Sequence, residues 1–177
     1  MRKPVVLRNV AFPVFMLLLL PPVWLVILPL NLLVDLAVLL VGYQLLIERV
    51  GTRGAMRALG WKTAVVTWLF GFLADFAGGG LLLGATMANE LFPALRQESW
   101  NAIQSAIIYN PFRNLWALSI VLLAVALVGV LIYLFARYIG LRRIGDLAAR
   151  RKLALALAVC TAPYLFLLPT EWLYSLP

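Results

Sequence analysis

The feature that most constrains this chain is its series of long apolar runs, which leave little polar sequence between them. They make 64% of the 177 residues hydrophobic, and only 12% are charged. A soluble domain carries about a quarter charged residues, and about 20 apolar residues suffice for a helix to cross a bilayer. The sequence therefore predicts a single α-helical, multi-pass membrane domain over residues 1–177.

The apolar runs predict an all-α bundle of about five transmembrane helices. We expect the first run, residues 10–48, to break at Pro29 to Asn31, because proline removes a backbone donor and asparagine favours turns. A re-entrant element is the alternative reading of this run. A short amphipathic helix near residues 93–108 is expected at the outer interface. The expected spans are residues 10–28, 31–48, 63–85, 115–136 and 153–170.

The basic residues predict the direction in which the chain crosses the membrane. Loops rich in Lys and Arg remain cytoplasmic, because their translocation is disfavoured. With five spans and a cytoplasmic N-terminus, all 15 basic residues except Arg96 and Arg113 lie inside. The C-terminus is then outside, and a bacterial cytoplasmic membrane is the expected location.

Two carboxylates, Asp35 and Asp75, fall inside expected spans. A charge in hydrocarbon is costly, so such residues usually face protein or a wet cavity and indicate a functional site. At 1.5 Å per residue, Asp35 is expected about 7 Å and Asp75 about 15 Å from the outer ends of their spans. Asn31 lies one turn from Asp35 on the same face. The sequence therefore predicts a cation or proton site in the outer half of the bilayer, formed by Asp75, Asp35 and Asn31.

Other roles for the two aspartates remain open at this point. Each carboxylate can pair with Arg113 or with a helix N-terminus, or can hold helices together in its protonated form. An intramembrane aspartyl dyad, as in the lipoprotein signal peptidases, is a further alternative. That family's glycine-asparagine-aspartate-arginine pattern is not found in this chain.

The inventory of reactive side chains is thin. The chain has no histidine and one cysteine, Cys160, which excludes histidine-bound zinc, histidine-ligated haem and a Ser-His-Asp triad. We expect no cofactor and no metal, and an enzyme is the least favoured class.

Glycines cluster around Asp75, over residues 71–84. Small residues let helices approach closely, so this stretch predicts packing within the chain or between copies in a homo-oligomer. Three consecutive glycines also weaken a helix, and an unwound segment with cation-binding carbonyls is the alternative. The packing or hinge candidates are Gly71, Gly78, Gly79, Gly80 and Gly84.

Two basic segments are expected on the cytoplasmic side. Their first role is to set the orientation of the chain, and they also offer positive charge to anionic lipid headgroups or to structured RNA. The candidates for binding such a partner are Arg53, Arg57, Lys62, Arg137, Arg142, Arg143, Arg150, Arg151 and Lys152.

Three functions follow from these features, in order of preference. The first is an oligomeric channel-like or transporter-like protein that handles ions or protons at the aspartates. The second is a membrane anchor whose basic face binds an anionic partner. The third is a non-catalytic subunit of a larger membrane complex.

Overall fold

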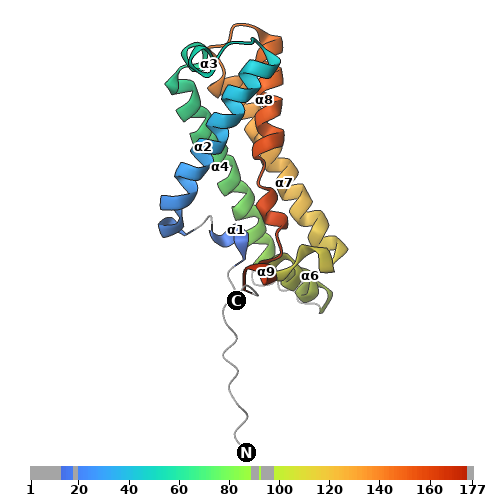
Figure 1. The fold of residues 1–177 in the computed structure, drawn as a ribbon. Helices are drawn as coiled ribbons and strands as arrows, with labels where there is room; N and C mark the ends of the chain where they lie inside the picture. Colours follow the sequence, from blue (N-terminus) through green and yellow to red (C-terminus); the bar gives the residue numbers. More distant parts are fainter. Residues whose placement is uncertain (1–12, 18–19, 89–91, 93–97, 175–177) are drawn as a thin grey trace, which may run out of the picture.

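The protein is a bundle of antiparallel helices, shown by a computed structural model that describes residues 13–17, 20–88, 92 and 98–174. The described part is helical and contains no strand (Figure 1). The elements in order are α1 (Val14–Leu17), α2 (Pro21–Leu46), α3 (Thr52–Leu59), α4 (Trp61–Thr86), α6 (Glu98–Tyr109), η2 (Pro111–Arg113), α7 (Leu115–Phe135), η3 (Ala136–Gly140), α8 (Leu147–Thr161), η4 (Tyr164–Leu167) and α9 (Thr170–Tyr174).

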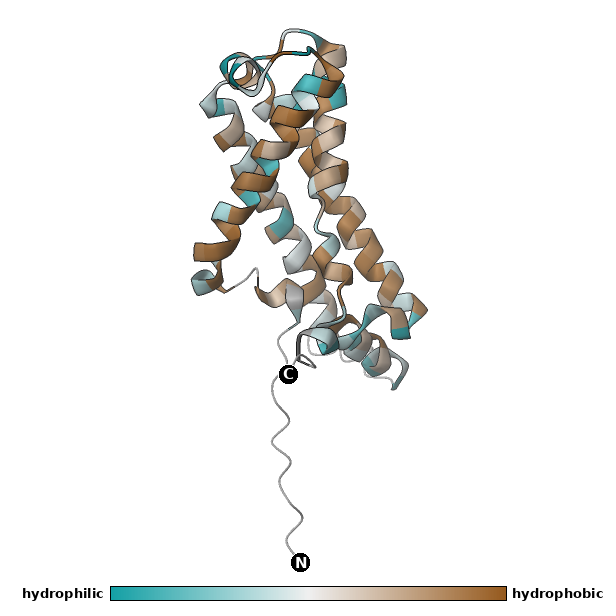
Figure 2. Ribbon diagram, viewed as in Figure 1, coloured by the Kyte–Doolittle hydropathy of each residue, from teal (hydrophilic) through white to brown (hydrophobic). Residues whose placement is uncertain are grey.

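Three helices are long and apolar enough to cross a membrane: α2, α4, and α7 continued by the π-helical turn η3. Each has 26 residues, or about 39 Å at 1.5 Å per residue, which exceeds the roughly 30 Å hydrocarbon core. Large apolar side chains on their outer faces are exposed, including Leu25 at 82% and Leu45 at 78%. Figure 2 shows this apolar colour along the helices. Such a surface suits a protein inserted in a membrane.

The expected break at Pro29 to Asn31 is wrong, because α2 runs through these residues without interruption. A transmembrane helix tolerates an internal proline when neighbouring helices supply compensating contacts. Here the Trp68 indole nitrogen on α4 donates to the carbonyl oxygen of Leu28 at 3.0 Å, beside the proline. Residues 10–28 and 31–48 therefore do not form two short spans, although residues 10–12 and 18–19 lie outside the described part.

The last expected span, residues 153–170, is also divided. Helix α8 begins earlier, at Leu147, and ends at Thr161, so its 15 residues reach only about 22 Å. Pro163 and Pro169 then interrupt the chain, and only the short elements η4 and α9 follow. The structure thus contains three candidate spans within its described residues, and a five-span bundle is not confirmed.

The expected amphipathic helix near residues 93–108 corresponds to α6, which starts at Glu98, while residues 93–97 lie outside the described part. It packs against α7 and α4 through its buried Ala106 and Ile107. Asn114 caps the following helix, α7, by accepting hydrogen bonds from the backbone nitrogens of Trp116 and Ala117. These contacts place α6 across the ends of α4 and α7.

Successive long helices run in opposite directions (Figure 1). Helices α2 and α7 run toward the end that carries α3 and the turn between η3 and α8, while α4 and α8 run away from it. We call this the basic end, because α3 and that turn carry Arg53, Arg57, Arg142 and Arg143. The opposite end, with α6 and α9, is the α6 end. The predicted cytoplasmic N-terminus falls in residues 1–12, outside the described part.

The buried core forms two clusters, one toward each end. The first centres on Leu39, Leu153 and Leu157 near the basic end, and the second on Leu82 and Val121 nearer the α6 end. Every buried residue of α2 lies at Asp35 or later in the helix. The first half of α2 therefore contributes nothing to either cluster and diverges from α8 and η4 (Figure 1).

Candidate functional site

The two aspartates come together where α2 leaves the bundle. Asp35 and Asp75 are buried, with 6% and 8% of their surface exposed. A Cβ atom added at Gly71 would lie 3.4 Å from Asp35 Oδ2. Gly71 is one helical turn before Asp75. The Asp35 carboxylate therefore meets α4 at a level about 6 Å closer to the basic end than Asp75. The two carboxylates are therefore neighbours across the α2–α4 contact.

Both aspartates lie near the middle of their helices. Asp35 is about 17 Å from the end of α2 at Leu46, and Asp75 about 21 Å from the start of α4 at Trp61. The expected depth of Asp35, about 7 Å below an outer helix end, is wrong because it assumed a helix that begins at residue 31. Asp35 and Asp75 sit together near the middle of α2 and α4, and Asp75 is about 17 Å from the end of α4 at Thr86, close to the expected 15 Å.

Asp35, Asp75 and Asn31 line one cavity of about 510 Å³. Its walls are α2, α4, the end of α8 and residues 162–168, with single contributions from α1 and α7. Most of the wall is apolar, and none of the described residues lining it is Lys or Arg. The cavity thus joins an acidic group to an otherwise hydrophobic space.

The hydrogen-bonding partners of the two carboxylates are few. Asp75 Oδ1 is buried and has no partner among the described residues. Asp35 interacts with the side chain of Thr161, but the single hydroxyl hydrogen of Thr161 goes to the Leu157 carbonyl oxygen at 2.8 Å. The Thr161 hydroxyl therefore lies within reach of two acceptors, the Leu157 carbonyl oxygen and the Asp35 carboxylate.

The glycines of α4 divide into two sets. Gly78 is buried, and a Cβ there would overlap Val128 Cγ2 on α7 and lie 3.1 Å from Phe166 Cε2; Gly79 is buried too. Gly80 and Gly84 face open space. The helix is continuous through all of them, so the alternative of an unwound segment with free carbonyls is wrong. Gly78 serves close packing between helices, as small residues do in membranes.

The basic candidates gather at the basic end, but some have structural partners. Arg150 Nη2 donates to the carbonyl oxygens of Ile144 at 2.6 Å and Arg142 at 3.3 Å, which fixes the turn before α8. The Arg137 guanidinium lies 5.0 Å from the Tyr138 ring centroid and donates to the Tyr133 hydroxyl at 3.0 Å. The exposed candidates are Arg53, Arg57, Lys62, Arg142, Arg143, Arg151 and Lys152.

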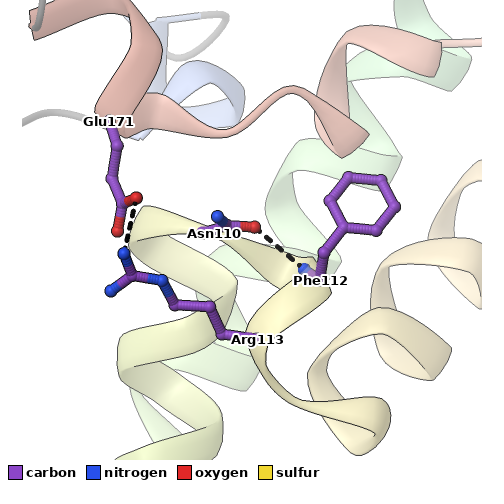
Figure 3. Close-up of polar contacts among 4 residues, drawn as sticks. All are labelled: Asn110, Phe112, Arg113 and Glu171. Atoms are coloured by element: carbon purple, nitrogen blue, oxygen red, sulfur yellow. Dashed lines mark hydrogen bonds and ion pairs between the residues drawn. The ribbon is translucent and has the colours of Figure 1, made fainter.

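Arg113 lies at the α6 end and does not reach the aspartates. It forms an ion pair with Glu171, with 2.9 Å between Nη2 and Oε2 (Figure 3). Asn110 Oδ1 accepts from the Phe112 backbone nitrogen and caps the short helix η2 (Figure 3). The suggested pairing of Arg113 with Asp35 or Asp75 is therefore wrong. Arg96, the other basic residue expected outside, is not described.

Sequence reasoning missed the contribution of the chain between Cys160 and Leu168. Cys160, Thr161 and Tyr164 line the cavity, opposite α2 and α4. The only signal in the sequence was Pro163, which ends α8 and turns the following residues toward the aspartates. Nothing in the spacing of this segment indicates which helix it will face.

Comparisons with protein-family models, with curated proteins and with solved structures return no match for this chain.

Proposed function

We propose that this membrane protein binds and transfers a proton or another cation at Asp35 and Asp75. The observation that supports the proposal is the shared cavity, where both carboxylates lie at mid-helix depth and Asp75 Oδ1 has no protein partner among the described residues. Buried carboxylates need a compensating positive charge or a proton. No Lys or Arg among the described residues lines the cavity, so none of these residues supplies that charge.

Transfer across the membrane needs access from both sides in turn. Between the cavity and the basic end lie side chains with no exposed surface, among them Leu39, Leu153 and Leu157. These residues join α2 to α8, two helices in direct contact. Access to the basic end therefore requires α2 and α8 to separate. This is the alternating movement expected of a transporter with a central site.

A flux measurement tests the proposal. Purified protein is reconstituted into liposomes that contain a pH-sensitive dye, and a gradient of protons, Na⁺ or K⁺ is imposed. We expect the wild type to dissipate at least one gradient, and Asp35→Asn and Asp75→Asn to lower that rate about tenfold or more, because amides keep the shape but neither charge nor exchangeable acid.

The matched control is Glu171→Gln, which neutralises a carboxylate at the α6 end, away from the cavity. It should retain the wild-type rate. Circular dichroism and elution volume establish that each variant is folded. Equal rates for wild type and the double variant Asp35→Asn/Asp75→Asn, or no flux from either, would remove the proposal.

A second function, binding of anionic lipid at the basic end, has its own supporting observation. Eight exposed cations lie at or beside that end, the seven exposed candidates and Arg49, whereas Glu48 and Asp146 are the acidic residues on the adjoining turns. Cations near a membrane surface attract anionic headgroups by about 1 kcal/mol each. Native mass spectrometry would count anionic lipids retained by the protein.

The variant Arg142→Gln/Arg143→Gln/Arg151→Gln should retain fewer lipids, and the retention should fall with salt. Arg113→Gln, at the α6 end, is the control and should retain as many as the wild type. Bound mass that is removed by nuclease, in place of lipid, would favour an RNA partner instead. If the wild type and both variants retain the same amount of bound lipid or RNA, neither ligand binds through these arginines.

A further inference from the structure

The size of the cavity is the first indication of what it holds. At about 510 Å³ it is far larger than the roughly 30 Å³ that one water molecule occupies in the liquid. It falls instead in the range of about 300–1,000 Å³ that is typical of small-molecule sites. A bare metal ion held by the two carboxylates would leave most of this space empty, and the apolar part of the wall offers it no further ligands.

The chemistry of the wall is the second indication. Leu30, Val34, Phe72 and Phe166 give it apolar and aromatic surface. The hydroxyl of Tyr164, another lining residue, donates to the Val159 carbonyl oxygen at 2.7 Å, so its only donor is already used. Hydrophobic walls with a few convergent polar groups are the usual anatomy of a site for an organic ligand.

The charge in the wall selects the sign of the ligand. Asp75 is more than nine-tenths buried, lines the cavity and leaves Oδ1 without a partner among the described residues. Asp35 lies beside it. Two acidic groups without a described basic neighbour favour a cation, and aromatic rings such as Phe72 add attraction for one.

The cavity opens where a ligand would arrive from the bilayer. The first half of α2 diverges from α8 and η4 (Figure 1), and the cavity has an exposed lining residue on each side: Leu30 on α2 at 56%, and Leu165 on η4 at 66%. Both are apolar, so the rim is compatible with lipid. On its other side, α2 is held against α4, where the Trp24 and Phe72 rings meet edge to face at 5.7 Å.

From these observations we infer that the cavity binds a membrane-soluble organic cation, which enters between α2 and η4 and places its charge against Asp35 and Asp75. This inference names the substrate class of the site in the proposed function and rests on it. Binding a monocation displaces one proton from the carboxyl pair when that pair is protonated, so the net charge of the site is unchanged. Uptake of the ligand and release of a proton are then linked.

Two probes of the same shape and opposite charge test the inference. Tetraphenylphosphonium and tetraphenylborate are offered to the full chain in nanodiscs of neutral lipid, and binding is measured by equilibrium dialysis against empty nanodiscs. We expect saturable binding of the phosphonium at about one per chain, and no competition by the borate. Asp35→Asn/Asp75→Asn should weaken phosphonium binding about tenfold or more, while Glu171→Gln should not.

Cys160 provides a second readout that requires no substitution. It is the one cysteine of the chain, it is exposed, and it lines the cavity. Bound phosphonium should slow its reaction with N-ethylmaleimide at least severalfold in the wild type, and the borate should leave the rate unchanged. This measurement holds even if the double aspartate variant fails to fold.

The outcomes separate the two proposals. Aspartate-dependent proton flux without phosphonium binding or cysteine protection would overturn the inference and leave the proposed function standing. Suppose that phosphonium protects Cys160 and binds in an aspartate-dependent way, but that no flux is measured in its presence or absence. That result would support the binding site and overturn the proposed transport. Equal binding of both probes, or equal phosphonium binding by wild type and double variant, would mark nonspecific partition and overturn the inference.

Discussion

Two glycines separated by one residue on α4 should respond oppositely to the same substitution. Gly78 faces α7, where an added Cβ would overlap Val128 Cγ2 and lie 3.1 Å from Phe166 Cε2, whereas a Cβ at Gly80 meets nothing within 4 Å. We therefore expect Gly78→Ala to destabilise the protein and Gly80→Ala to leave it as stable or more stable.

The expected difference can be worked out from these contacts. Glycine to alanine in a helix gains about 0.5–1 kcal/mol from the lower flexibility of the unfolded chain, and this gain is common to both variants. Only Gly78→Ala adds the cost of overpacking, about 1–3 kcal/mol, because Val128 is fully buried and a helical valine has one favoured rotamer. Gly78→Ala should thus be less stable than Gly80→Ala by about 1–3 kcal/mol.

Thermal unfolding in detergent, followed by size-exclusion recovery, measures this difference. For a chain of this size, 1 kcal/mol shifts Tm by about 2–4 °C, so the two variants should differ by about 2–12 °C. Val128→Ala removes the overlapping methyl groups and should cost less in the Gly78→Ala background than in the wild type. If Gly78→Ala melts with or above Gly80→Ala, the close α4–α7 contact in this structure is wrong.

Two further predictions concern the start of α8 and the outer face of α4. Asp146 Oδ1 accepts a hydrogen bond from the Ala148 backbone nitrogen at 2.9 Å. Asp146→Ala should therefore lower the free energy of unfolding by about 1 kcal/mol, while Asp146→Asn keeps the cap. Equal melting temperatures for the two variants would contradict the capping role. If copies of the chain assemble through the exposed Gly80 and Gly84, Gly80→Leu/Gly84→Leu should lower the subunit count measured by native mass spectrometry, and a wild-type monomer would refute that assembly.

The continuity of α2 through Pro29 and Asn31 could not be predicted from the local sequence. Pro29 and Asn31 are locally unfavourable in a helix, which is why a break is expected there. The structure carries α2 through them, with Trp68 of α4 bonded to the Leu28 carbonyl oxygen. A residue 40 positions away in the chain therefore supports the helix at the point where local preference opposes it, and no local pattern contains that information.

The candidate site shows the same division. Placing Asp35 and Asp75 within apolar helices needs only hydropathy, and the sequence alone indicated that two carboxylates would lie inside the membrane near small residues. The depth of Asp35 could not be obtained, because it depends on where α2 begins. Thr161 and Tyr164 could not be assigned to the same site, since the turn after Pro163 can face any neighbouring helix.

The sequence by itself thus determined that this is a helical membrane protein with basic and apolar segments in alternation and two acidic residues inside its long apolar helices. These properties depend only on how each segment partitions between lipid and water, because lipid accepts apolar residues and rejects charges wherever they occur along the chain. The tertiary structure alone decided that the part of α2 before Asp35 diverges from the bundle, that α8 ends beside the aspartates, and that a cavity of about 510 Å³ remains between them. Those features arise from which side chains meet across helices, and that depends on packing between distant segments.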